Sequence, residues 1–91
     1  MAEKRPTVTY QVLVERKAER EMEVLPEDVL YLIGEVLDDL GENPRPPGAK
    51  KLTGKEGYRI RKGAYRVLYT IDDPSRIVRI YRIGHRREVY R

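Results

Sequence analysis

The stretch YRIRKGAYRVLYTIDDPSRIVRIYRI, residues 58–83, decides the fold of this chain. Its β-branched and aromatic side chains form three runs, at residues 58–61, 65–71 and 77–83, with short polar segments between them. Connections this short join neighbouring antiparallel strands. The stretch therefore predicts a three-stranded antiparallel meander, with Gly84 ending the last strand.

The segments before the meander predict one strand and two helices. Residues 8–14 (VTYQVLV) have strand composition, and residues 16–24 predict a short, charged helix. Residues 27–40 predict a longer helix that ends at Gly41, and residues 43–57 predict a loop because they contain three prolines and three glycines. The apolar stripe of the longer helix consists of Val29, Leu32, Ile33, Val36, Leu37 and Leu40.

The order β-α-α-β-β-β predicts an α+β fold in which all 91 residues form one domain. We expect a single, largely antiparallel sheet with two helices packed on one face. Side chains alternate along a strand, which leaves Arg59, Arg61 and Arg66 together on the uncovered face. The same alternation predicts that Arg79 and Arg82 of the last strand lie on different faces.

Charge is divided unevenly along the chain. The total of 19 basic and 15 acidic residues gives a net charge of +4. Residues 1–42 hold 5 basic and 11 acidic side chains, whereas residues 43–91 hold 14 basic and 4 acidic ones. A field of one sign attracts ligands of the other, so the basic half favours a polyanion such as nucleic acid. Lys50, Lys51 and Lys55 make the long loop part of this basic half.

Other counts exclude whole classes of protein. The chain has no cysteine, which excludes disulfides, thiolate nucleophiles and cysteine-bound zinc, and its one histidine excludes a multi-histidine metal site. We expect neither a metal nor a cofactor. No apolar run approaches the ~20 residues of a membrane span, and the charged first residues are unlike a signal peptide. The expected location is therefore the cytoplasm, with no membrane partner.

The basic residues of the meander suggest chemistry on phosphate. Three arginines on one face repel one another unless an anion binds there, and each guanidinium can donate two hydrogen bonds to phosphate oxygens. A solvated polar face is the alternative explanation. His85 is the chain's one histidine, the residue type that can act as acid or base near neutral pH, and nearby arginines would favour the phenolate of Tyr90. RNA cleavage by the 2′-hydroxyl needs such a base, an acid and cations at the phosphate, but plain RNA binding explains the same residues.

Three stretches of the chain resemble the RelE/ParE superfamily of bacterial and archaeal toxins from type II toxin–antitoxin pairs. They are LIGEVLDDLGENPRPPGAKKLTG at residues 32–54, YRIR-x3-YRVLY at residues 58–69 and IGHRREVY at residues 83–90. The resemblance spans nearly the whole chain. It implies the α+β fold already expected from the residues.

The two branches of this superfamily imply different targets. Resemblance to the RelE branch implies a ribosome-dependent mRNA endonuclease. Such an enzyme cuts A-site codons, next to 16S rRNA, and so inhibits translation. The ParE branch keeps the fold but poisons DNA gyrase. The sequence is more similar to the RelE branch, because it fills that branch's full set of motif positions with Arg59, Arg61, Arg66, His85, Arg86 and Tyr90.

The resemblance also implies roles for these residues. Arginine keeps its proton, so Arg59 and Arg61 are expected to be phosphate clamps where some RelE members have lysine. The base is then Tyr90 or His85 and the acid His85 or Arg86, with Arg87 able to exchange roles with Arg86.

Further RNA contacts are expected from Lys50, Lys51, Lys55 and Arg87. The implied protein partner is a RelB-like cognate antitoxin bound in a toxin–antitoxin complex. A non-catalytic module that binds RNA or antitoxin remains a third hypothesis.

Overall fold

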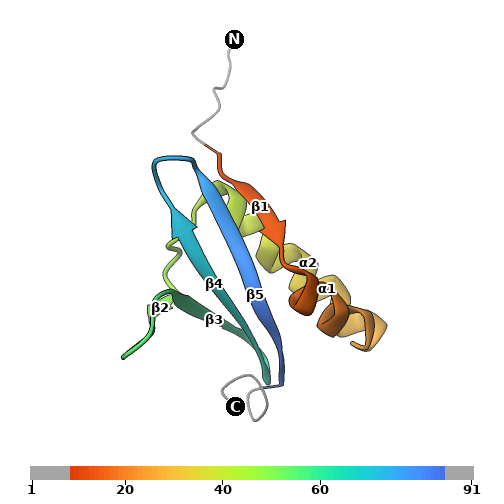
Figure 1. Cartoon of the computed structure of the whole chain (residues 1–91). Helices are drawn as coiled ribbons and strands as arrows, with labels where there is room; N and C mark the ends of the chain where they lie inside the picture. The colour runs from red at the N-terminus through yellow and green to blue at the C-terminus, as the bar shows by residue number, and fades with distance from the viewer. Residues whose placement is uncertain (1–8, 86–91) are drawn as a thin grey trace.

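A computed structural model describes residues 9–85; residues 1–8 and 86–91 lie outside the described part. Two helices follow the first strand, and four strands complete the chain (Figure 1). The elements are β1 (Gln11–Val14), α1 (Arg16–Glu23), α2 (Glu27–Glu42), β2 (Lys50–Lys51), β3 (Tyr58–Lys62), β4 (Tyr65–Asp72) and β5 (Ile77–His85).

The strands form one mixed sheet in the order β1-β5-β4-β3-β2. The antiparallel pairing of β3, β4 and β5 confirms the predicted meander, and β1 runs parallel to β5 at the edge of the sheet. The α+β class is therefore confirmed. The short strand β2 corrects the expectation that residues 43–57 are entirely loop, because Lys50 pairs with Arg59 and Lys51 with Tyr58.

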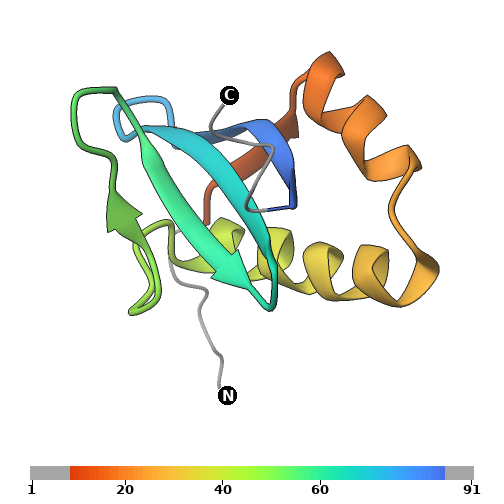
Figure 2. The ribbon, with the colours of Figure 1, turned by 90° about the horizontal axis from the view of Figure 1, so that it is seen from below.

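The core lies between the helices and one face of the sheet, as predicted. Figure 2 shows α2 lying along that face, with α1 on the side of the sheet where β1 ends. Leu32, which was expected in the apolar stripe of α2, is instead 39% exposed, because it lies at the margin of the stripe. The buried residues of this core are Ala18, Ile33, Val36, Leu37, Leu40, Val67, Tyr69, Val78, Ile80 and Ile83.

Two glycines expected to end elements lie inside them. Gly41 belongs to α2, and its carbonyl accepts a hydrogen bond of 2.7 Å from the Tyr10 backbone N–H. An added Cβ at Gly41 would lie 3.3 Å from the Tyr10 carbonyl oxygen, so glycine allows α2 and the chain entering β1 to approach closely. Gly84 continues β5 opposite Arg66, so the prediction that it ends the strand is wrong.

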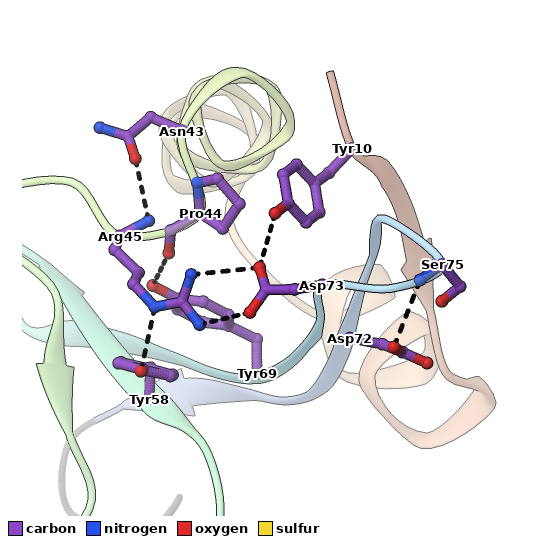
Figure 3. Close-up of polar contacts among 9 residues, drawn as sticks. All are labelled: Tyr10, Asn43, Pro44, Arg45, Tyr58, Tyr69, Asp72, Asp73 and Ser75. Atoms are coloured by element: carbon purple, nitrogen blue, oxygen red, sulfur yellow. Dashed lines mark hydrogen bonds and ion pairs between the residues drawn. The ribbon is translucent and has the colours of Figure 1, made fainter. Parts of the chain in front are cut away.

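A polar clasp ties the loop after α2 to the β4–β5 turn; its members are Tyr10, Arg45, Tyr58 and Asp73 (Figure 3). Arg45 donates two hydrogen bonds to the Asp73 carboxylate, of 2.9 and 3.3 Å, and its Nε donates to the Tyr58 hydroxyl at 3.1 Å. The Tyr10 hydroxyl donates to the same carboxylate at 2.6 Å. The clasp therefore fixes the start of β3 against the far end of β4.

Tyr69 secures the same loop from inside the core. Its fully buried hydroxyl donates to the Pro44 carbonyl at 2.7 Å, and its ring stacks on Tyr58 with 5.8 Å between centroids. Burial raises the pKa of the Tyr69 hydroxyl to about 12. The phenol therefore stays protonated and remains a donor throughout the physiological range.

The clasp predicts an acid-sensitive contribution to stability. Hydrogen bonds from Arg45 and then Tyr10 hold the pKa of the Asp73 carboxyl below its usual range. A carboxyl with a lowered folded-state pKa stabilises the fold above its unfolded pKa of about 3.9, and this contribution is lost as the pH falls through the folded pKa.

We therefore expect Asp73→Asn to unfold at lower urea concentration than the wild type at pH 7, with the gap closing below about pH 4. Urea titrations at a series of pH values measure the gap. Asp72→Asn is the matched control, because the one hydrogen bond that Asp72 accepts within residues 9–85 is a long 3.4 Å bond from the Ser75 N–H. A gap for Asp73→Asn that stays constant down to pH 3 would contradict this account.

Candidate RNA-binding face

The sheet face turned away from α2, here called the open face, gathers basic side chains from four strands. Residues paired across a sheet project to the same side, and the register therefore defines the members of this face. Its one carboxylate among the described strand residues is Asp72, at the far end of β4. Its basic members are Lys50, Arg59, Arg61, Arg66, Arg79 and Arg82.

Arg59, Arg61 and Arg66 lie next to one another on the open face. Arg61 and Arg66 are direct cross-strand partners, and Arg59 pairs with Leu68, the next residue of β4 on the same side as Arg66. Side chains directly opposite have Cβ atoms about 4.5–5.5 Å apart, and like charges at that distance destabilise a sheet. An anion bound between these guanidiniums would remove that penalty. The arrangement therefore suits a phosphate group.

The last strand contributes two more arginines because it contains a bulge. The register shifts between Leu68 and Tyr69, which pair with Arg82 and Ile80, and so Tyr81 is the extra residue of β5. Arg79 and Arg82 consequently lie on the same face, and the expectation that they lie on different faces is wrong. Simple alternation could not reveal this, because an extra residue reverses the side on which every later side chain projects.

Arg82 is held by a carboxylate of α1. Its Nε donates to Glu21 at 2.9 Å, and the other oxygen of Glu21 accepts a 2.8 Å bond from the Ile83 backbone N–H. Both charged side chains are largely buried, at 17% and 23% exposed. Beyond the end of β1, Glu21 thus provides the acceptor that a neighbouring strand would otherwise supply to β5. No pattern in the sequence predicts this ion pair.

His85 projects to the side of the sheet opposite Arg59, Arg61 and Arg66, and it shares a cleft with Arg82. It pairs with Tyr65 at the end of β5, and the two rings meet edge to face with centroids 5.8 Å apart. Both rings line a cleft of about 350 Å³ beside the α1–α2 turn, together with Glu21 and Leu25. The open face therefore does not include the imidazole, although we expected His85 to close one edge of the arginine cluster.

The remaining predicted residues are distributed as follows. Lys50 lies on the open face beside Arg59, whereas the Lys51 ammonium lies 5.5 Å from the ring centroid of Tyr58, on the other side of the sheet. Lys55 is exposed in the turn between β2 and β3. Arg86, Arg87 and Tyr90 lie outside the described residues.

Two features are absent from residues 9–85, the described part of the chain. In that range no three histidine, cysteine or carboxylate side chains gather closely enough to hold a metal ion. No helix of the described chain is both long and apolar enough to cross a bilayer.

Comparison with known proteins shows that this chain is similar to toxins. Residues 12–90 match the family model of the ParE toxin of the type II toxin–antitoxin system parDE. The chain is 35% identical to toxin RelG of Mycobacterium tuberculosis, over 90% of this chain and 97% of the relative. It is 30% identical to the putative toxin RelE1 of Methanocaldococcus jannaschii, over 90% and 96% of the two chains.

Solved structures show the same similarity. The toxin–antitoxin complex RelBE2 of Mycobacterium tuberculosis contains a chain with a TM-score of 0.79 and 34% identity, matching 87% of this chain and 100% of the other. The archaeal RelE–RelB complex of Pyrococcus horikoshii gives a TM-score of 0.75 at 26% identity, over 88% and 98% of the two chains. Sequence motifs, sheet order and these matches agree: the chain belongs to the RelE/ParE superfamily of type II toxin–antitoxin toxins.

Proposed function

We propose that this toxin is an endoribonuclease that cleaves mRNA in the ribosomal A site and thereby inhibits translation. The observation that carries the proposal is the group of Arg59, Arg61 and Arg66 on one sheet face, with two of them directly opposite each other. The names of the relatives, RelG and RelE, support the RelE branch. The proposed target, mRNA beside 16S rRNA, implies that the protein acts in the cytoplasm.

The proposed reaction is attack by the 2′-hydroxyl on the adjacent phosphorus. A base removes the proton of the 2′-hydroxyl, the new O2′–P bond forms, and the P–O5′ bond breaks as an acid protonates the departing 5′-oxygen. The products are a 2′,3′-cyclic phosphate and a 5′-hydroxyl. Arg59, Arg61 and Arg66 stabilise the negative charge that grows on the phosphoryl oxygens, which is the role of preorganised cations.

The two proton transfers need groups beside these arginines. His85 lies across the sheet from them, beside Tyr65, and this separation argues against His85 as the base. We therefore assign the base to Tyr90. At the departing 5′-oxygen we place Arg86, whose guanidinium keeps its proton and donates a hydrogen bond to that oxygen while water protonates it. Tyr90 and Arg86 are the other residues that the family resemblance suggested. Both belong to the six residues that follow His85, and neighbouring arginines would favour the phenolate of Tyr90.

We also propose a cognate, RelB-like antitoxin as the partner of this chain. Similar solved structures are RelB–RelE complexes from Mycobacterium tuberculosis, Pyrococcus horikoshii and Escherichia coli. A cationic open face suits an acidic antitoxin segment, since charges of opposite sign across an interface favour association.

A ParE-like gyrase poison is the second candidate, because the matching family model describes a ParE toxin. Codon-mapped primer extension in a translating extract distinguishes the two. The proposal predicts cuts within A-site codons that require ribosomes, whereas a gyrase poison leaves mRNA intact and traps gyrase–DNA cleavage complexes. Folded wild-type protein that cuts none of several mRNAs would exclude the nuclease, and RNA binding alone would indicate a non-catalytic module.

A further inference from the structure

The open face extends well beyond Arg59, Arg61 and Arg66. We infer that Arg79 binds an RNA backbone phosphate at the end of this face remote from Arg66, so that the RNA strand runs along the sheet toward the β4–β5 turn. The inference rests on the proposed function and adds the path of its substrate.

The arginines occupy three successive levels of the open face. The first level holds Arg61 and Arg66, and the second holds Arg59 and Arg82, which flank Leu68. Arg79, opposite Thr70, forms the third. Same-side residues of a strand are about 7 Å apart, which puts Arg79 roughly 14 Å along the strand from Arg66. That distance is too long for both to bind one phosphate, and it suits successive phosphates of an extended strand.

Arg79 has the exposure and chemistry for this contact. Its side chain is exposed, and no carboxylate among residues 9–85 lies within ion-pair distance of it. Arg82, by contrast, is paired with Glu21. The half-buried Thr70 beside Arg79 offers a hydroxyl as a further donor. A guanidinium next to a hydroxyl donor is well suited to bind a phosphate.

The bulge at Tyr81 makes this row of arginines compatible with the core. Ile80 and Ile83 are both buried against the helices, although strict alternation would put residues three apart on opposite faces. Because of the extra residue, both isoleucines project into the core, and Arg79 and Arg82 both project from the open face. Bulges are frequent beside functional sites because they redirect side chains in this way.

A binding experiment that does not depend on cleavage tests the inference. The probe is a short fluorescent single-stranded RNA of mixed sequence with 2′-O-methyl groups, which cannot attack its own phosphates. We expect Arg79→Gln to weaken binding about threefold to tenfold and to reduce the slope of log affinity against log salt by about 0.7. Arg79→Lys should keep the wild-type slope because it keeps the charge.

Arg20→Gln is the matched control, because Arg20 is exposed on α1 and its substitution removes the same charge away from the open face. Equal affinities of Arg79→Gln and Arg20→Gln for RNA, together with equal binding of the two variants to ribosomes, would overturn the inference, once thermal unfolding shows both folded. Cosedimentation with ribosomes separates the RNA sources: a loss seen only there indicates ribosomal RNA, and a loss in both assays indicates mRNA. Polyglutamate serves as a third probe and stands in for an acidic antitoxin segment. If Arg79→Gln weakens binding to polyglutamate but not to RNA or ribosomes, the inference is overturned in favour of an acidic protein partner.

These outcomes are separate from those of the proposed function. Wild-type protein that cuts no mRNA, yet binds RNA through Arg79, would remove the nuclease proposal and leave this inference standing. Wild-type protein that cuts A-site codons, with RNA and ribosome binding indifferent to Arg79, would remove only the inference.

Discussion

Arg66→Ala is expected to lower kcat for A-site mRNA cleavage by about 10²–10³-fold, the usual loss when one preorganised transition-state stabiliser is removed. Arg66 is half-buried in the central strand β4, directly opposite Arg61, so its side chain leaves the sheet at a defined point of the open face. The lost interaction is strongest when charge develops at phosphorus, and we therefore expect kcat to fall more than KM rises. Primer extension over a time course measures the rate.

Two further variants test the role of this arginine pair. Arg66→Lys keeps the charge but cannot donate the paired hydrogen bonds of a guanidinium, so it should restore only part of the rate. Arg61→Ala truncates the exposed partner on the same level and should also slow cleavage, with less risk to folding. Wild-type rates in folded Arg66→Ala and Arg61→Ala would contradict the assignment of this face as the cleavage site.

Gly57→Ala is expected to destabilise the fold by about 2–4 kcal/mol. Gly57 is buried just before β3 with φ of 113°, a conformation that L side chains rarely adopt. A Cβ there would lie 2.6 Å from the Tyr69 carbonyl oxygen, in the backbone of the neighbouring strand. Relief requires β3 to move away from β4, and Arg59 would move with it. Urea unfolding measures the loss.

Gly63→Ala provides the matched control for Gly57→Ala. Gly63 lies in the β3–β4 turn with φ of 60°, and an added Cβ would meet no atom within 4 Å. Gly63→Ala should therefore lower the free energy of unfolding only by the backbone strain of the left-handed region, about 1–2 kcal/mol. Equal losses for the two alanine variants would show that the close approach of Gly57 to Tyr69 is unimportant.

Local sequence patterns were sufficient to predict most of the architecture. The helical spacing of Ile33, Val36, Leu37 and Leu40 predicted α2, and short polar segments between β-rich runs predicted the meander. Alternation also put Arg59, Arg61 and Arg66 on the uncovered face. These inferences needed only neighbours within a few residues, because the period of a helix or a strand is a property of the backbone itself.

The spacing of the isoleucines in β5 indicates the bulge, although strict alternation does not predict it. Ile80 and Ile83 are three residues apart, and both can reach the core only if one extra residue lies between them. An extra residue at that place also puts Arg79 and Arg82 on one face, contrary to our prediction. Which residue of the partner strand lies opposite the bulge depends on pairing with β4, and that pairing is not encoded within β5.

The sequence by itself therefore determined six of the seven elements, the meander and the basic open face, since each follows from local periodicity and composition. Only the tertiary structure decided which distant charges meet. Glu21 reaches Arg82 across 61 residues of chain, and Arg45 reaches Asp73 across 28. The pairing of His85 with Tyr65 in the tertiary structure also puts the imidazole on the side of the sheet away from Arg59, Arg61 and Arg66. Pairings of this kind depend on how the helices and strands pack, and no local pattern of residues specifies that packing.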